Sequence, residues 1–457
     1  MLHLPNRYGT TLIMALGLCL YIIHMQHSNI AGFGLYISWA IDSYSHLEYI
    51  ARVADTRAVP APGACWECHQ PPLYYLLAAL PYSIAKDFHL LSADVEVHVP
   101  PVLLGSVPTS PVLAVRVLSL CFYMVFAFFG ARLLAMEVRW RPVYYIGLCL
   151  LVFWPYGVTK AAMISNDVPL YMAQAAALYY ILRWRRDEAA GSLALAMLWN
   201  GIAFAFKYTG ITVTPFIGLV VLLKCYENRR LAWQLLAKPV LLSLCVGLVL
   251  AGGTFARTYY HYRIATHSSV PLLVPSGPVV VRLMPVPNDR LEYFALPDFG
   301  GYMQSPFLGE SRHPSSEMSY FMNFVLKSSL FGIPHWTPIR TARALTVLLC
   351  GMLVYMACSL PYLALKDRAA ALDVLPFVVF VALQLAALIT YRVLYPHTGN
   401  QDFRFIYPTT IAMTVLYSKV LSWHRTHSYS HIFWLGALLA GGFSCTSIAF
   451  ILVNSRG

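Results

Sequence analysis

Acidic and imidazole side chains that can transfer protons occur at two places in the first half of the chain, each next to an apolar run. Asp42 and His46, in DSYSHLEY, are four residues apart, so a helix places them on one face. Asn166 and Asp167, in ISND, follow an apolar run and precede a proline. A carboxylate in such a place can act as a general base. A helix N-cap explains both places as well, because Asp and Asn are favoured there.

Basic side chains form a second group, at the predicted outer ends of apolar segments. Lys207, in FAFKYTG, lies between two short apolar segments, where a lysine departs from the usual concentration of positive charge on the inner face. Snorkelling of its long side chain is the simplest alternative to anion binding. Lys160, Arg257 and Arg404 lie at the outer ends of other spans. Four cations around one face predict a site for an anionic, lipid-linked ligand.

The stretch CWECHQPPLYY, residues 65–75, has the C-x-x-C-H spacing that attaches a c-type haem. The sequence offers no second axial ligand and no apolar haem pocket, so haem attachment is disfavoured. A disulfide between Cys65 and Cys68 and two free thiols both stay open. Glu67 and His69 are candidate ligands for a divalent metal or a substrate, although two ligands do not make a metal site.

The elements that must position these residues are membrane helices. Of the 457 residues, 58% are hydrophobic and 11% are charged, whereas soluble proteins carry roughly a quarter charged residues. The formal net charge of +12 does not indicate nucleic-acid binding, because the basic residues stand in short clusters between apolar segments. That distribution is typical of cytoplasmic loops. The composition predicts an all-α, polytopic membrane protein.

About eleven spans of roughly 17–25 residues are expected. They lie near residues 10–28, 112–135, 142–160, 168–184, 190–206, 209–224, 239–258, 341–365, 371–391, 404–422 and 431–453. The first of them lacks a small-residue cleavage site, so it is interpreted as a signal anchor. The short apolar stretch 71–86 begins with two prolines and is interrupted by Pro81, which favours a helix in the interface. If this stretch does not cross, every short basic cluster falls on the inner side.

Two long segments then face outward, and they divide the chain into three parts. Residues 1–258 form an N-terminal transmembrane module whose first extracytoplasmic loop, 29–111, contains interfacial helices. Residues 259–340 form a second extracytoplasmic loop region, and residues 341–457 form the C-terminal transmembrane helices.

Four motifs, in this order, carry a family resemblance: DSYSHLEY, HQPPLYYLL, ISND and KYTG. They resemble the bacterial membrane glycosyltransferases of the GT-C type, a group that includes protein O-mannosyltransferases (family 39) and the aminoarabinose transferase acting on lipid A. The match covers most of the first half, with weaker counterparts in MNFVLKSSLFG and FRFIYP. The resemblance implies a GT-C-like fold in which HQPPLYY marks an interfacial helix beneath the active site and the two cysteines are incidental.

The resemblance also implies a reaction and a site. A sugar, hexose or pentose, would pass with inversion from a polyprenyl-phosphate donor to an acceptor hydroxyl at the extracytoplasmic face. The catalytic residues would be the general base Asp42 with His46 and Asp167. The donor phosphate would be bound by Lys207, Arg257, Arg404 and Lys160. Residues that contact substrate would be Tyr49, Gln70, Tyr74, Asn166 and Tyr208.

The chain departs from the family at Ser43, where many relatives carry a second carboxylate next to the first. His46 or Asp167 would then supply the missing polar partner of Asp42. Some relatives bind a divalent metal just before the two prolines, where this chain has Glu67 and His69. No cofactor is certain from the sequence.

Two other functions stay open: a lipid-linked sugar transporter or flippase, and a non-catalytic membrane assembly subunit. The sequence shows no internal repeat of the kind common in transporters. The expected partners are membrane lipids, a polyprenyl-phosphate sugar and an acceptor that is a protein, a lipid or a glycan, with no nucleic acid. The expected location is the bacterial inner (plasma) membrane with the site facing outward, or the endoplasmic reticulum if the source is eukaryotic. The sugar and the acceptor stay open.

Overall fold

The fold is known from a computed structural model of the chain. It describes residues 7–27, 37–87, 94–99, 102–227, 241, 249, 252–261, 293–294, 298–308, 320–332, 339–394 and 398–455. In these ranges the first half contains α1 (Arg7–His27), α2 (Ile37–Thr56), α3 (Leu73–Asp87), β1 (Asp94–Val99), β2 (Val102–Pro108), α4 (Thr109–Glu137), α5 (Arg141–Val152), α6 (Pro155–Ala161), α7 (Asp167–Asp187), α8 (Ala190–Phe206), η1 (Tyr208–Val213) and α9 (Thr214–Glu227). The second half contains α11 (Gly253–Tyr259), α14 (Phe299–Gln304), α16 (Phe321–Phe331), α17 (Ile339–Lys366), α18 (Arg368–Leu394), η4 (Thr398–Gln401), η5 (Phe403–Ile406), α19 (Thr409–Thr426) and α20 (Ser430–Asn454).

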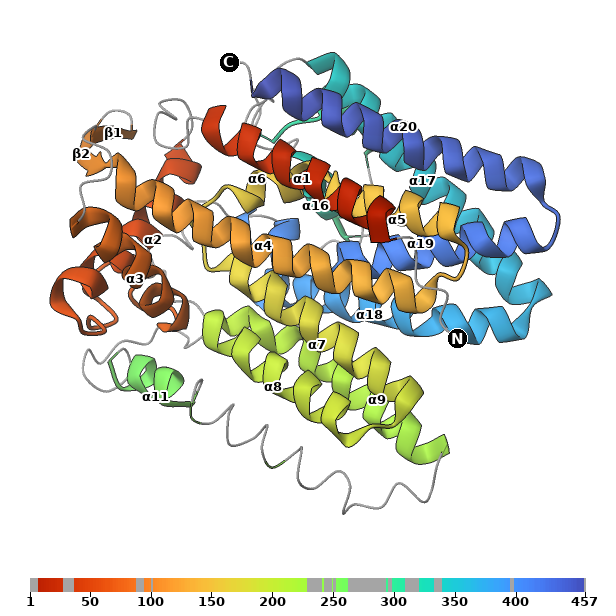
Figure 1. Ribbon diagram of the computed structural model, residues 1–457, viewed down its shortest axis with the longest axis horizontal. Coiled ribbons are helices and arrows are strands. Elements are labelled where there is room, and N and C mark those ends of the chain that lie inside the picture. Colours follow the sequence, from red (N-terminus) through yellow and green to blue (C-terminus); the bar gives the residue numbers. More distant parts are fainter. Residues whose placement is uncertain are drawn as a thin grey trace.

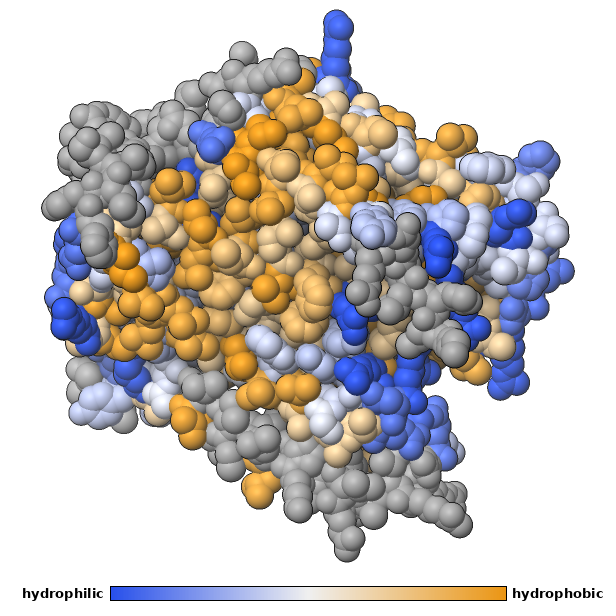
Figure 2. Space-filling view, in the orientation of Figure 1, coloured by the Kyte–Doolittle hydropathy of each residue, from blue (hydrophilic) through white to orange (hydrophobic). Residues whose placement is uncertain are grey.

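Long apolar helices dominate the molecule, which confirms the predicted α-helical, polytopic class. Among the described residues, six helical segments are long and apolar enough to cross a membrane: α1, α4, η1 with α9, α17, α18 and α20. Only 28% to 39% of the residues in their most apolar windows are buried. Most of each helix therefore lies on the surface, as contact with lipid requires. Figure 2 shows the result on one face, a broad apolar band that gives way to polar residues toward the ends.

The α5–α6 pair makes a seventh candidate span, bent by 54°. The sequence predicts one continuous span over 142–160, but Pro155 cannot donate a backbone hydrogen bond and its ring clashes with the preceding turn, so the helix breaks there. The indole of Trp154, at the break, donates to the carbonyl of Ser329 at 2.6 Å. Helix α16 thus packs against the bend.

Helix α7 is absent from these candidate spans although it runs through the bundle (Figure 1). Most of its side chains are buried by neighbouring helices, so it does not need an apolar surface. Arg186 follows Asp167 by nineteen residues, which is about 28 Å along a helix and close to the roughly 30 Å of a bilayer core. The predicted total of about eleven spans stays a prediction, since the predicted span 239–258 lies largely outside the described residues.

Helices α2 and α3 and the β1–β2 hairpin gather at one end of the bundle, here called the α2–α3 end (Figure 1). Helix α3 packs against α2 and α4; that residues 71–86 lie in the membrane interface stays a prediction. The hairpin is antiparallel, with a register shift between Val97 and His98. The sequence analysis did not predict it, although valines alternate along DVEVHV in the period of a strand.

The opposite end of the bundle is held by a chain of ion pairs. Glu137, at the end of α4, pairs with Arg186 of α7 at 2.8 Å and with Lys419 of α19 at 2.6 Å. Lys419 also pairs with Asp373 of α18 at 2.6 Å. These contacts connect four helices at the end where the predicted cytoplasmic basic clusters lie.

Candidate active site at the α2–α3 end of the bundle

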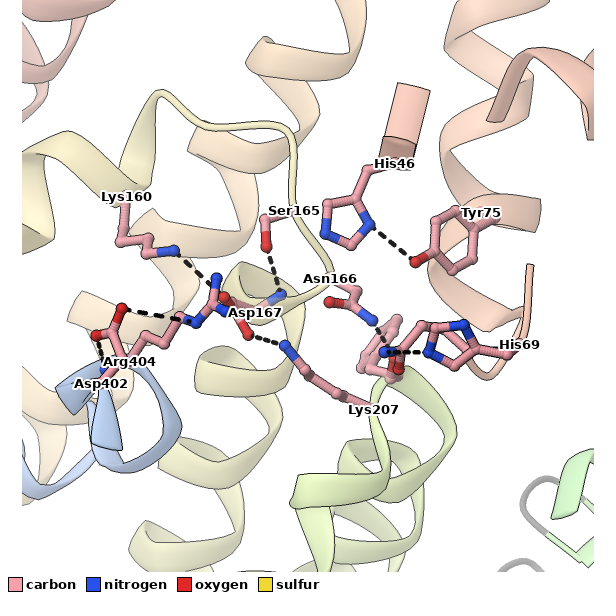
Figure 3. A network of polar contacts seen from close by, with 12 residues as sticks. His46, His69, Tyr75, Lys160, Ser165, Asn166, Asp167, Lys207, Asp402 and Arg404 are labelled. Carbon is pink, nitrogen blue, oxygen red and sulfur yellow. Dashed lines mark hydrogen bonds and ion pairs between the residues drawn. The ribbon is translucent and has the colours of Figure 1, made fainter. Parts of the chain in front are cut away.

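Asp167 is the centre of a buried ionic cluster, here called the cationic cluster, which also contains Lys160, Lys207 and Arg404. One carboxylate oxygen of Asp167 accepts a hydrogen bond from the Lys207 ammonium at 2.5 Å, and the other accepts one from Lys160 at 3.2 Å. The Asp167 side chain is fully buried. Helix α6 supplies Lys160, the first turn of α7 supplies Asp167, and the end of α8 supplies Lys207. The fold therefore brings together residues from three helix ends (Figure 3).

The short helix η5 brings a second carboxylate and a third cation to this cluster. Arg404 points toward Asp167 in Figure 3, and its Nε lies 3.7 Å from a carboxylate oxygen of Asp402. The other Asp402 oxygen accepts from the backbone N–H of Arg404 at 2.9 Å. Burial raises the pKa of the Asp402 carboxyl, against the lowering effect of Arg404 and Lys160. Arg404 was predicted from the sequence, whereas Asp402, two residues earlier in the same motif, was not.

The five charged side chains described here, those of the cationic cluster and Asp402, do not balance one another. Lys160, Lys207 and Arg404 carry three positive charges, and Asp167 and Asp402 carry at most two negative charges. Among these side chains the net charge is therefore at least +1. A group of cations at the end of an apolar bundle fits an anion that is bound during function.

The structure tests the simpler explanations offered for Lys207 and Asn166. Lys207 is only 8% exposed and pairs with Asp167, so its ammonium does not snorkel to water. Asn166 does occupy the N-cap position of α7, but its side chain makes no capping hydrogen bond. Instead its amide donates to the carbonyl of Phe206 at 3.3 Å, which joins the start of α7 to the end of α8.

Helices α2 and α3 contribute an imidazole and stacked tyrosines. His46 Nδ1 and the Tyr75 hydroxyl are 2.9 Å apart. The Tyr75 ring stacks on Tyr49 with centroids 3.7 Å apart, and buried Tyr74 meets His46 edge-on. Figure 3 shows His46 and Tyr75 beyond Asn166, on the side of Asp167 away from Lys160.

Asp42 belongs to the same helix as His46. Helix α2 begins at Ile37, five residues before Asp42, so the N-cap interpretation of Asp42 is wrong. The helical backbone places Asp42 one turn before His46, whereas its side chain lies outside the part of the chain that the structure describes. Its role as general base stays a prediction.

The segment between α2 and α3 also borders the cluster, on the side where Figure 3 shows His69. Cys65 and Cys68 form a disulfide, the first of the two arrangements that the sequence left open. Arg257 does not join the cationic cluster: its guanidinium donates to the carbonyls of Pro60 at 3.1 Å and Cys68 at 2.6 Å. Tyr208, predicted to contact substrate, donates to the carbonyl of His69 at 3.4 Å.

The predicted metal ligands lie in this segment. His69 Nδ1 donates to the carbonyl of Trp66 at 2.7 Å, and its Nε2 lies 3.1 Å from the Gln70 amide. Burial lowers the pKa of His69 to about 4, so the imidazole is neutral near pH 7. Glu67 is buried as well. Within the described ranges no group of three or more His, Cys, Asp or Glu side chains could hold a metal ion. Metal binding by Glu67 and His69 stays a prediction.

Arg116 holds two helix ends next to the site, a role that was not predicted from the sequence. It is 9% exposed, and it donates from Nη2 to the carbonyl of Met25 at 2.6 Å and from Nε to that of Ala162 at 3.1 Å. These carbonyls belong to the ends of α1 and α6, where a cation is favoured. Arg116 thereby fixes the turn that leads to Asp167. Its signal in the sequence is an arginine inside the apolar run PVLAVRVLSL.

Asp167→Asn should destabilise the protein by about 3–5 kcal/mol, because it leaves two buried ammonium groups without their carboxylate. Thermal unfolding of the purified protein in detergent measures this loss. Glu137→Gln is the matched variant. The Glu137 side chain is only 5% exposed, and it also pairs with two cations. Both variants should unfold at lower temperature, but only Asp167→Asn should change ligand binding. Wild-type stability of Asp167→Asn would contradict the observed pairing.

Comparison with known proteins gives a distant match. No family model and no curated protein matches the chain. The crystal structure of ArnT from Cupriavidus metallidurans bound to undecaprenyl phosphate matches 98% of this chain and 77% of its own, with a TM-score of 0.42 and 14% identity. The apo structure of the same protein matches 94% of this chain and 77% of its own, with a TM-score of 0.39 and 14% identity. Similarity at this level does not assign an activity, which must be argued from the side chains of this chain.

Proposed function

We propose that the chain is an integral membrane glycosyltransferase that moves a sugar from a polyprenyl-phosphate-linked donor to an acceptor hydroxyl. The observation that carries the proposal is the group of three cations, Lys160, Lys207 and Arg404, that the fold places around the buried Asp167. A leaving phosphate gains negative charge as its bond to the sugar breaks, and cations already in place stabilise that charge.

The position of the cationic cluster supports a lipid-linked donor. The cluster lies at the ends of α6, α7 and α8, and the apolar surface of the bundle begins next to these ends (Figures 1 and 2). A polyprenyl chain could stay in the hydrocarbon layer while its phosphate reaches the cluster. We infer that this end faces outward, because the basic clusters of the short loops lie at the other end.

The proposed chemistry is a single displacement. Asp42 takes the proton of the acceptor hydroxyl, whose oxygen forms a bond to the anomeric carbon as the bond to the phosphate oxygen breaks. Polyprenyl phosphate leaves with the bonding electron pair, and the anomeric configuration inverts. His46, one turn from Asp42 and joined to Tyr75, would help to orient the acceptor. Both oxygens of Asp167 are occupied by lysines, so we assign it the positioning of Lys160 and Lys207 instead of proton transfer.

A transporter of the same lipid-linked sugar would need cations that bind its phosphate, but it would not need a general base. Its site is expected near the middle of the membrane, whereas the cationic cluster lies at the first turn of α7 and at the end of α8. This position favours the transferase.

Undecaprenyl phosphate, the lipid in the ArnT structure, is a suitable probe for the phosphate site. At one hundred times its dissociation constant it should stabilise the purified protein by about 2.7 kcal/mol. Lys207→Gln should abolish this stabilisation. Lys224→Gln should retain it, because Lys224 pairs with Glu188 at the opposite end of α7. An equal shift in all three proteins, or none in the wild type, would contradict a phosphate site at the cationic cluster.

A further inference from the structure

The segment Pro60–Gln70, here called the disulfide loop, is held in place by hydrogen bonds to its backbone carbonyls. The two terminal nitrogens of Arg257 donate to the carbonyl of Pro60, which precedes the disulfide, and to the carbonyl of Cys68, one of its two cysteines. The hydroxyls of Tyr208 and Thr258 each lie 3.4 Å from the carbonyl of His69, to which they donate. All three donors come from outside the loop, from η1 and α11.

The disulfide and Arg257 act on the same stretch of backbone. Cys68 is fully buried, and its carbonyl accepts from Arg257 at 2.6 Å while its sulfur is bonded to Cys65. A planar guanidinium presents donors in a rigid fork, which suits two carbonyls at fixed positions. The disulfide loop is therefore fixed by the Cys65–Cys68 bond and by the two hydrogen bonds from Arg257.

The disulfide loop ends beside the cationic cluster. His69 and Gln70 follow Cys68 directly, and Tyr208, which holds the carbonyl of His69, directly follows Lys207. Figure 3 shows His69 on the Asn166 and Lys207 side of the site. Any movement of the carbonyls at Cys68 and His69 would therefore move side chains that border the cluster.

We propose that Arg257 is a positioning residue and not a phosphate ligand: together with the Cys65–Cys68 disulfide, it fixes the disulfide loop so that His69 and Gln70 border the site at Lys207. This inference rests on the proposed function for the role of Lys207. A dithiol reductant would open the disulfide to two thiols and itself become a cyclic disulfide, and the loop would then depend on Arg257 and its neighbours alone. Reduction of the disulfide is therefore expected to lower the rate of sugar transfer.

The first test does not depend on activity. The full-length protein in membranes is reduced with a dithiol and treated with a maleimide, and peptide mass spectrometry follows modification of Cys68. In the wild type the buried thiol should react slowly. In Arg257→Gln it should react at least about tenfold faster, since two of the hydrogen bonds that oppose opening of the loop are lost. Arg343→Gln is the matched control, because Arg343 donates to the carbonyl of Gln304 at 3.0 Å. Equal rates in Arg257→Gln and the wild type would overturn the proposal.

The second test separates positioning from phosphate binding. Arg257→Gln, the pair Cys65→Ser with Cys68→Ser, and the combination of all three are compared in sugar transfer. Positioning predicts that each lowers activity about 10- to 100-fold, the range seen for small misplacements, and that the combination is little worse than either. A phosphate contact predicts that the losses multiply, because independent effects add in free energy.

Arg257→Lys gives a further distinction, since it keeps the charge and loses the two-pronged geometry. It should resemble Arg257→Gln if the residue acts through the loop, and activity near that of the wild type would overturn the proposal. Absence of transfer by the wild type would reject the proposed function instead, while the thiol measurement would still decide the role of Arg257.

Discussion

Lys207→Gln is expected to lower sugar transfer by about 10²–10³-fold, the loss typical when one group that stabilises a developing anion is removed. Lys207 is 8% exposed, pairs with Asp167 at 2.5 Å, and its ammonium lies 5.4 Å from the centre of the Phe405 ring. In this low-dielectric setting its charge acts on a bound phosphate with little screening by water. The measurement is the consumption of polyprenyl-phosphate sugars by membranes that contain equal amounts of folded wild type or variant.

Two variants control for the structural part of this loss. Lys207→Arg keeps the positive charge, so it should retain more activity than Lys207→Gln. Lys224→Gln removes a lysine whose ion pair with Glu188, at 2.7 Å, lies at the opposite end of the bundle, and it should transfer sugar at the wild-type rate. Normal transfer by Lys207→Gln would show that the cationic cluster is not where the leaving phosphate binds.

Asp42→Asn should reduce transfer by about 10²–10⁴-fold, because an amide cannot accept the acceptor proton in the transition state. The prediction combines the family position of Asp42 with its place on α2, one turn before His46, whose ring is hydrogen-bonded to Tyr75 at 2.9 Å. Initial rates of transfer at saturating donor measure the effect. Donor binding should be nearly unchanged, since Asp42 is assigned to the acceptor side.

Asp55→Asn is the matched control for Asp42. Asp55 is on the same helix, but it is exposed and pairs with Lys86 at 2.8 Å, a type of contact that contributes about 0–1 kcal/mol. Its variant should be as active and as stable as the wild type. Equal activities for the two variants would remove Asp42 from the reaction and leave the base unassigned.

The membrane helices and the cationic cluster could be predicted because they depend on side-chain type alone. Uninterrupted apolar runs predict α1, α4, α17 and α20, which are long enough to cross a bilayer. Charges at the ends of such runs are costly, so the sequence places Lys160, Lys207 and Arg404 around one face and marks Asp167 separately. The structure adds that Asp167 forms ion pairs with Lys160 and Lys207.

Other features could not be predicted because they depend on backbone groups and on packing. Arg257 was grouped with the phosphate ligands by its charge, but its partners are the carbonyls of Pro60 and Cys68, which no residue type reveals. The two cysteines were judged incidental, yet they close the loop that Arg257 holds.

The most direct test of the central claim is mass spectrometry of the lipids from cells that contain the wild type or Asp42→Asn, with equal insertion of both proteins. If the chain is a transferase, one polyprenyl-phosphate sugar should accumulate when the variant replaces the wild type, and its mass should identify the donated sugar. An unchanged set of polyprenyl-phosphate sugars would contradict the proposed transfer reaction.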